Sequence, residues 1–168
     1  MAHPRIDQHK FARAEWLRGL VGLSETDAAV RLEPINSISW MVGHMAWHER
    51  ECWFRRARGL RVEPILDAFA TGQAASVPSF AEMQAAWDRI VASADPFLDA
   101  LTTADLERRP RHDPRPNPPI VGSQVQYVTY HYWSHIGEVS AVRQILGHAG
   151  LAEYVGDFAP EAEYRREA

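Results

Sequence analysis

The sequence predicts an all-α protein, a four-helix bundle, and three observations support this fold class. Four long stretches place apolar residues at the three- and four-residue spacing of a helix that buries one face. The sequence shows no strand-like alternation of apolar and polar residues. The segments between the four stretches are polar or rich in glycine and proline, as connections between helices are. Helices of this kind pack with their apolar faces turned toward a common core.

The first helix is expected from about Arg5 to Gly22, where glycine closes it. A short turn or half-helix then ends before Pro34. His9 lies on the first helix without a second histidine at helical spacing. We therefore assign His9 to the surface or to packing rather than to metal binding.

The second helix is capped by Asn36 or Ser37 and continues to about Gly59. Its apolar face carries His44 and His48, which lie one helical turn apart. The same helix carries a run of charged residues that is typical of a solvated, salt-bridged face. This run consists of Glu49, Arg50, Glu51, Arg55 and Arg56.

A long connection of residues 60–78 precedes the third helix, which is expected from Ser79 to Leu101. Glu82 stands at the capping-box position of this helix. Pro96 lacks an amide N–H, so we expect it to kink the helix or to divide it.

The fourth helix is expected over residues 123–147, after a half-turn capped by Thr103 and a proline-dense segment, residues 111–122. It carries a second pair of histidines, His131 and His135, again four residues apart. Residues at this spacing lie on one helical face, so both rings are able to coordinate one cation.

Composition indicates one soluble domain over residues 1–168, with a C-terminal tail from about residue 148. The hydrophobic share is 46% and the net charge is −4, without a basic block, so we expect no nucleic-acid partner. We expect neither a signal peptide nor a membrane span. The single cysteine, Cys52, leaves no partner for an internal disulfide, and a cytoplasmic location is the prediction.

Two histidine pairs on two helices predict a metal site, because facing helices of a bundle deliver their inward side chains to one point. A catalytic divalent metal takes three protein ligands and keeps one position open. Imidazole donors favour zinc, nickel, iron(II) or copper. Glu138 is a candidate to orient a ligand, to act as a base or to pair with an arginine. The alternatives are that the histidines are hydrogen-bonded core residues, and that Cys52 is a thiolate ligand rather than a small buried hydrophobe.

Two segments, SISWMVGHMAWHERECWF and YHYWSHIGEVSAVRQILGH, together resemble the DinB/YfiT-like superfamily. The shared strings are GHxAW and HxxxHxGE. This resemblance implies a four-helix bundle, often dimeric, with a divalent metal held by three histidines. On the matching positions these are His44, His131 and His135, with His48 in contact either with a ligand residue or with the substrate. An alignment shifted by one turn would put His48 in the place of His44.

The resemblance also implies a class of activity, because some members are transferases or isomerases that use mycothiol, bacillithiol or glutathione. The leading hypothesis is therefore a metal-dependent thiol S-transferase that acts on a small electrophile, with zinc or nickel, or iron, as its metal. The second is a metal-dependent hydrolase with Glu138 or His48 as catalytic base. The third is a non-catalytic, stress-related metal-binding protein or scaffold. A homodimer is expected, and the arginines nearest in sequence for a thiol pocket are Arg111, Arg115 and Arg143.

Overall fold

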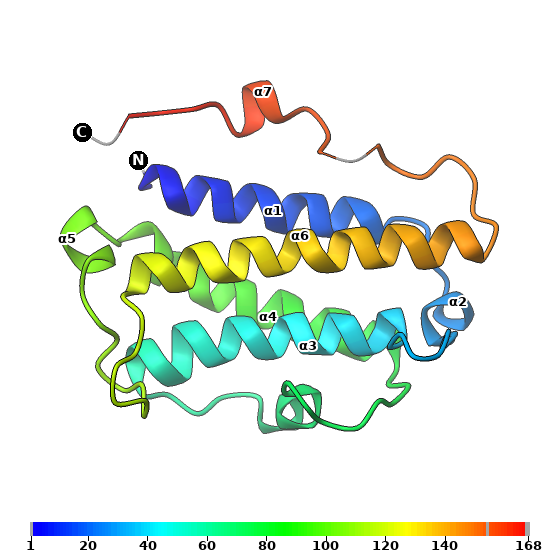
Figure 1. The fold of residues 1–168 in the computed structure, drawn as a ribbon, viewed down its shortest axis with the longest axis horizontal. Helices are drawn as coiled ribbons and strands as arrows, with labels where there is room; N and C mark the ends of the chain where they lie inside the picture. The colour runs from blue at the N-terminus through cyan, green and yellow to red at the C-terminus, as the bar shows by residue number, and fades with distance from the viewer. Residues whose placement is uncertain (1, 154, 167–168) are drawn as a thin grey trace.

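The computed structural model describes residues 2–153 and 155–166 and confirms the all-α prediction. Four long helices lie along the longest dimension of the molecule (Figure 1). They are α1 (Pro4–Leu20), α3 (Ile38–Arg50), α4 (Phe80–Asp99) and α6 (Val121–Ile145). α1 packs against α6 and α3 against α4, while α3 also contacts α6. As Figure 1 shows, α1 and α6 run in one direction and α3 and α4 in the other, so α3 and α6 are antiparallel.

The connection between α3 and α4 is long because these two helices run in the same direction, so the chain has to return along the bundle. α3 is prolonged by a π-helical segment, η1 (Glu51–Arg56), and the return path contains a short 3₁₀ helix, η2 (Pro64–Phe69). η2 packs against α3. The shorter α-helices are α2 (Glu25–Ala29), α5 (Thr103–Leu106) and α7 (Phe158–Glu161).

The helix starts follow from local hydrogen bonds. The Ser37 hydroxyl accepts from the amide of Trp40 at the start of α3, and Ser79 caps α4 in the same way. The cap of α5 is Thr102 rather than Thr103, because Thr102 and Asp105 form a reciprocal capping box. Of the two effects expected of Pro96, a division of the helix was wrong, because α4 continues through it to Asp99. The missing N–H of Pro96 removes one hydrogen bond, to the carbonyl four residues before it, and the helix ends within one turn.

The expectation of a solvated face was wrong for the first half of the charged run. Glu49 is 0% exposed, and Arg50 and Glu51 are buried as well. Arg55 is exposed and forms an ion pair with Glu51, as expected for a salt-bridged face. His9 is buried beside Glu49, so it belongs to packing and not to the surface.

The Glu49 carboxylate is the centre of a network that joins all four long helices. Its Oε1 accepts from Arg13 Nε of α1 and from the Tyr132 hydroxyl of α6, both at 2.8 Å. Its Oε2 accepts from Trp53 Nε1 at 2.5 Å and from a second Arg13 nitrogen. Trp87 Nε1 of α4 donates to the Tyr132 hydroxyl at 2.8 Å. Burial alone would raise the pKa of Glu49, but the Arg13 charge, His9 and the hydrogen bonds from both together outweigh burial and hold that pKa well below its usual range.

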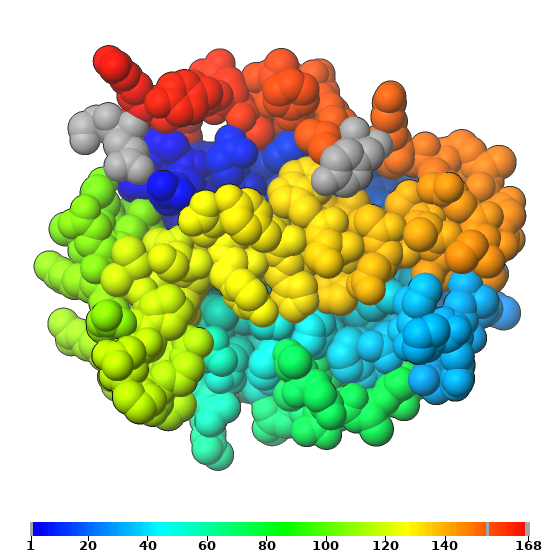
Figure 2. All heavy atoms as spheres, viewed as in Figure 1, coloured from blue at the N-terminus to red at the C-terminus, as the bar shows by residue number. Residues whose placement is uncertain are grey.

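The apolar tail residues Leu151, Tyr154, Val155 and Phe158 suggest that the C-terminal tail docks, and the tail lies along α1 (Figures 1 and 2). Gln8 Nε2 donates to the carbonyl of Ala162 at 2.7 Å, and the amide of Gly156 donates to Glu15 at 2.8 Å. Tyr154, one of the residues expected to dock, lies outside the described residues. Among the helices of the described chain, none has the length and apolar character that crossing a bilayer requires.

We predict that Glu49→Ala strongly destabilises the fold, since it leaves the Arg13 guanidinium buried without its main partner. The expected loss is about 3–5 kcal/mol in the free energy of unfolding, measured by urea titration. Glu107 is an exposed glutamate of the same chain, and Glu107→Ala serves as the control with an effect within about 0.5 kcal/mol. Equal losses in the two variants would contradict the assignment of Glu49 as the centre of the network.

Candidate metal centre

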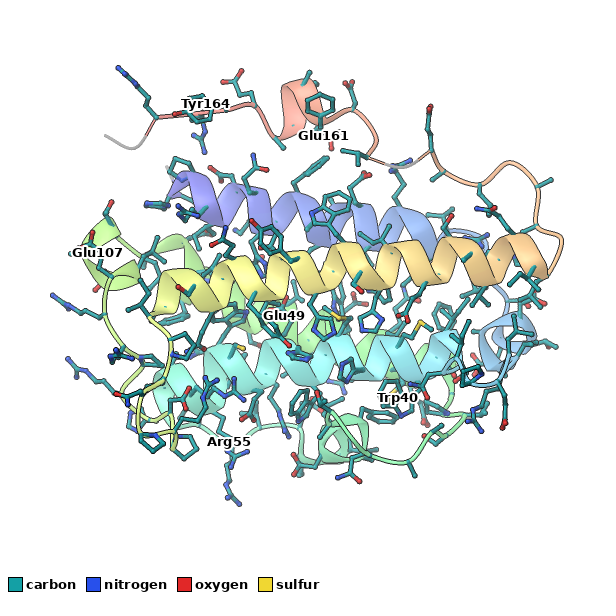
Figure 3. All side chains as sticks on the ribbon, viewed as in Figure 1. Trp40, Glu49, Arg55, Glu107, Glu161 and Tyr164 are labelled. Atoms are coloured by element: carbon teal, nitrogen blue, oxygen red, sulfur yellow. The ribbon has the colours of Figure 1, made fainter. Side chains whose placement is uncertain are left out.

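Four histidines meet between α3 and α6. The two from α3 lie on the part of that helix between Trp40 and Glu49, which are both labelled in Figure 3. The ligand atoms of His44, His48 and His131 all lie within 4.8 Å of one another. His135 joins them through His131, because the two Nε2 atoms are 2.9 Å apart. The structure thus brings together every histidine of the two predicted pairs.

His44 is held in one orientation. Its Nδ1–H donates to the carbonyl of Phe69 at 2.7 Å, and a carbonyl can only accept, so in the neutral ring Nε2 carries the lone pair. The ring lies between Trp40 and Trp47, nearly parallel to both, with centroids 4.8 Å and 5.7 Å away. This fixes Nε2 as the free donor atom of His44.

His135 is oriented in the same way by a carboxylate. Its Nδ1 lies 2.5 Å from Glu138 Oε2, one helical turn further along α6. This bond leaves Nε2 of His135 facing Nε2 of His131. The hydrogen bond from His135 lowers the pKa of Glu138, which keeps the carboxylate ionised. A metal-binding histidine commonly donates its second N–H to a carboxylate or a carbonyl, and His44 and His135 both do so.

His131 and His48 are less well satisfied. Nδ1 of His131 and both ring nitrogens of His48 are buried, and they make no hydrogen bond within the described part of the chain. The exposed ring of Tyr127 lies 5.8 Å from each of these two rings and borders the cluster on the α6 side. Buried polar atoms without a partner are rare in proteins, so they indicate a ligand at this position.

Burial keeps these histidines neutral. It lowers the pKa of His44 to about 4, that of His131 to about 3 and that of His48 to about 2, and the neighbouring imidazoles add to the effect. Only the neutral ring offers a nitrogen lone pair to a metal. The donors are all imidazoles, which suit zinc, nickel, iron(II) and copper and do not suit calcium. The residues therefore fit a divalent transition metal.

The other candidates predicted from the sequence lie elsewhere or have other partners. Cys52 is fully buried, and burial raises the pKa of its thiol to about 12, as expected for a small buried hydrophobe rather than a thiolate. Arg143 donates to the carbonyl of Gly19, and Arg115 pairs with Asp113.

Sequence reasoning missed two features beside the cluster. One is the carbonyl of Phe69 at the end of η2, which orients His44. The other is a cavity of about 450 Å³ that Trp47 borders and that Arg50, Arg55 and Arg61 line. A backbone acceptor carries no spacing signal, and the cavity combines Arg50 and Arg55 of the helix with Arg61 of the connection, so no single sequence pattern would have found either feature.

The comparison with protein families agrees with this arrangement. The family model described as the DinB superfamily matches residues 8–139, which is most of the chain and includes all four histidines and Glu138. Among curated proteins no match was found.

Proposed function

This chain belongs to the DinB superfamily, and we propose that it binds one divalent metal ion through His44, His131 and His135. The observation that carries the proposal is the fixed orientation of two of these rings. Nδ1 of His44 is bound to a carbonyl and Nδ1 of His135 to a carboxylate, so both present Nε2 to the cluster. Zinc and nickel are the first choices for such donors, and iron(II) is the next.

We further propose that the protein is an S-transferase that joins a low-molecular-weight thiol to a small electrophile. A divalent cation, when bound, lowers the pKa of a thiol or water that coordinates it. The cavity beside Trp47 supports an anionic co-substrate, because its lining includes three arginines against Asp67. Arg50 is engaged with Asp67 and Arg55 with Glu51, which leaves Arg61 to hold a carboxylate of the thiol.

The remaining expectations stay predictions. They are a homodimer, a cytoplasmic location and the choice among mycothiol, bacillithiol and glutathione. A hydrolase would use the same metal site with water in place of the thiol, and Glu138 or His48 would then act as base. The non-catalytic alternative predicts a site with saturated coordination or no metal at all.

Metal content gives the first prediction. The purified protein should contain roughly one zinc, nickel or iron ion per chain by elemental mass spectrometry, because the donor set is neutral and largely preformed. His44→Ala and His135→Ala should lose the ion while helicity by circular dichroism is kept. His112→Ala, which changes an exposed histidine of a loop, is the control and should keep the ion. Absence of metal in the wild type after incubation with each ion would overturn the site.

A substitution of Glu138 separates its possible roles. If Glu138 orients His135, Glu138→Gln should weaken metal affinity by about 10–100-fold in a competition with a chromophoric chelator. If Glu138 is instead a catalytic base, turnover should fall while metal affinity is unchanged. The hydrogen bond of 2.5 Å to His135 makes the first result the expected one.

Thiol consumption tests the activity. With metal-loaded protein and 1-chloro-2,4-dinitrobenzene, the thiolate sulfur bonds to the ring carbon, chloride leaves and one proton is released. We expect faster loss of at least one of mycothiol, bacillithiol and glutathione than without protein, and no acceleration in His135→Ala. If metal-loaded protein accelerates none of the three with this and a second electrophile, such as an epoxide, the S-transferase proposal is wrong and the metal site stands alone.

A further inference from the structure

His48 is the one histidine of the cluster whose ring has no partner at either nitrogen among the described residues. The residue is 5% exposed, so the ring is largely shielded from bulk solvent. The other three rings differ, since His44 and His135 are anchored at Nδ1 and His131 and His135 are paired at Nε2. A ring buried in this way requires an occupant for its lone pair or its N–H.

The position of His48 identifies that occupant. Its ring meets His131 edge-on with centroids 4.1 Å apart, and it meets His44 in the same way at 4.8 Å. Its ligand atom belongs to the group that lies within 4.8 Å of those of His44 and His131. Trp47 and Tyr127 border the ring of His48 on other sides. The ring of His48 therefore lies within the same cluster of donors and not apart from it.

The antiparallel arrangement of α3 and α6 accounts for this position (Figure 1). In antiparallel helices the second residue of one i,i+4 pair lies opposite the first residue of the other pair. His48 accordingly stands closest to His131, while the ring centroid of His44 lies 5.1 Å from that of His131 and 5.4 Å from that of His135. At this register the two facing pairs bring four imidazoles together in one cluster.

We propose that His48 is a fourth protein ligand of the metal, so that this chain holds its ion with four imidazoles. The inference rests on the proposed metal site and departs from the three-histidine set that the family resemblance implies. It also replaces the role of His48 as a catalytic base, because a nitrogen bound to metal does not accept a proton.

A fourth ligand makes reactivity depend on the metal. Tetrahedral zinc with four protein ligands has no position left for a thiol or water, as in structural zinc sites. Nickel(II) and iron(II) accept higher coordination numbers and would retain open positions. The chain would then bind zinc as an inert ion and use nickel or iron(II) for chemistry.

Cobalt(II) is the probe that tests the ligand count, because its visible absorption depends on the number and type of its ligands. Wild type, His48→Ala and Glu138→Gln are titrated with Co²⁺, and their spectra and dissociation constants are compared. Glu138→Gln is the matched control, since it weakens a hydrogen bond to a ligand and keeps every ligand.

We expect His48→Ala to bind Co²⁺ with a changed spectrum and with affinity lowered by more than about 100-fold, beyond the effect of losing an outer hydrogen bond. Added imidazole should restore the wild-type spectrum in His48→Ala, and Glu138→Gln should keep that spectrum throughout. An unchanged spectrum and affinity in His48→Ala would overturn the fourth ligand while leaving the three-histidine site in place. Failure of the wild type to bind Co²⁺ would instead overturn the metal site itself.

A measurement on the wild type decides the question if His48→Ala does not fold. X-ray absorption of the zinc-loaded protein counts coordinated imidazoles through their multiple-scattering signal. Four imidazoles are expected, and three imidazoles with one oxygen ligand would overturn the proposal.

Discussion

The buried carboxylate of Glu49 is the interaction on which the arrangement of the helices depends. It accepts hydrogen bonds from α1, η1 and α6, and through Tyr132 it is connected to α4. A buried charge is stable only when its partners are in place, so the network tolerates little displacement of one helix along another. Glu49 directly follows His48, and Tyr132 directly follows His131. The contact that sets the register of α3 against α6 therefore also sets the register of the two histidine pairs.

The connection between α3 and α4 takes part in the site as well as closing the bundle. η2 lies against α3, and its last residue supplies the carbonyl that fixes the tautomer of His44. The same segment forms one side of the arginine-lined cavity, with Trp47 between that cavity and the ring of His44. A molecule bound in the cavity would contact Trp47, which stacks on the ring of His44. The segment thus links the space available to a co-substrate with the orientation of a metal ligand.

The long helices and both histidine pairs could be predicted from the sequence because each depends on spacing within one helix. His44 and His48, like His131 and His135, share a face whatever the rest of the chain does. The prediction failed where a residue's role depends on a partner distant in sequence. Glu49 in a charged run looked solvated, yet Arg13 of another helix makes its burial stable. The role of the Phe69 carbonyl could not be predicted for the same reason, since a backbone group gains its role only through tertiary structure.

Neutral imidazoles explain how a bundle can hold such a site in its interior. Four carboxylates at these positions would repel one another and would need nearby cations to remain buried. Imidazoles avoid this cost, because burial itself keeps His44, His48 and His131 uncharged at neutral pH. Burial still leaves the ring nitrogens in need of hydrogen-bond partners, and the four rings differ in whether they have them. Outer partners hold His44 and His135, whereas His48 has none in the described chain, and a bound cation is the partner that satisfies all four rings at once.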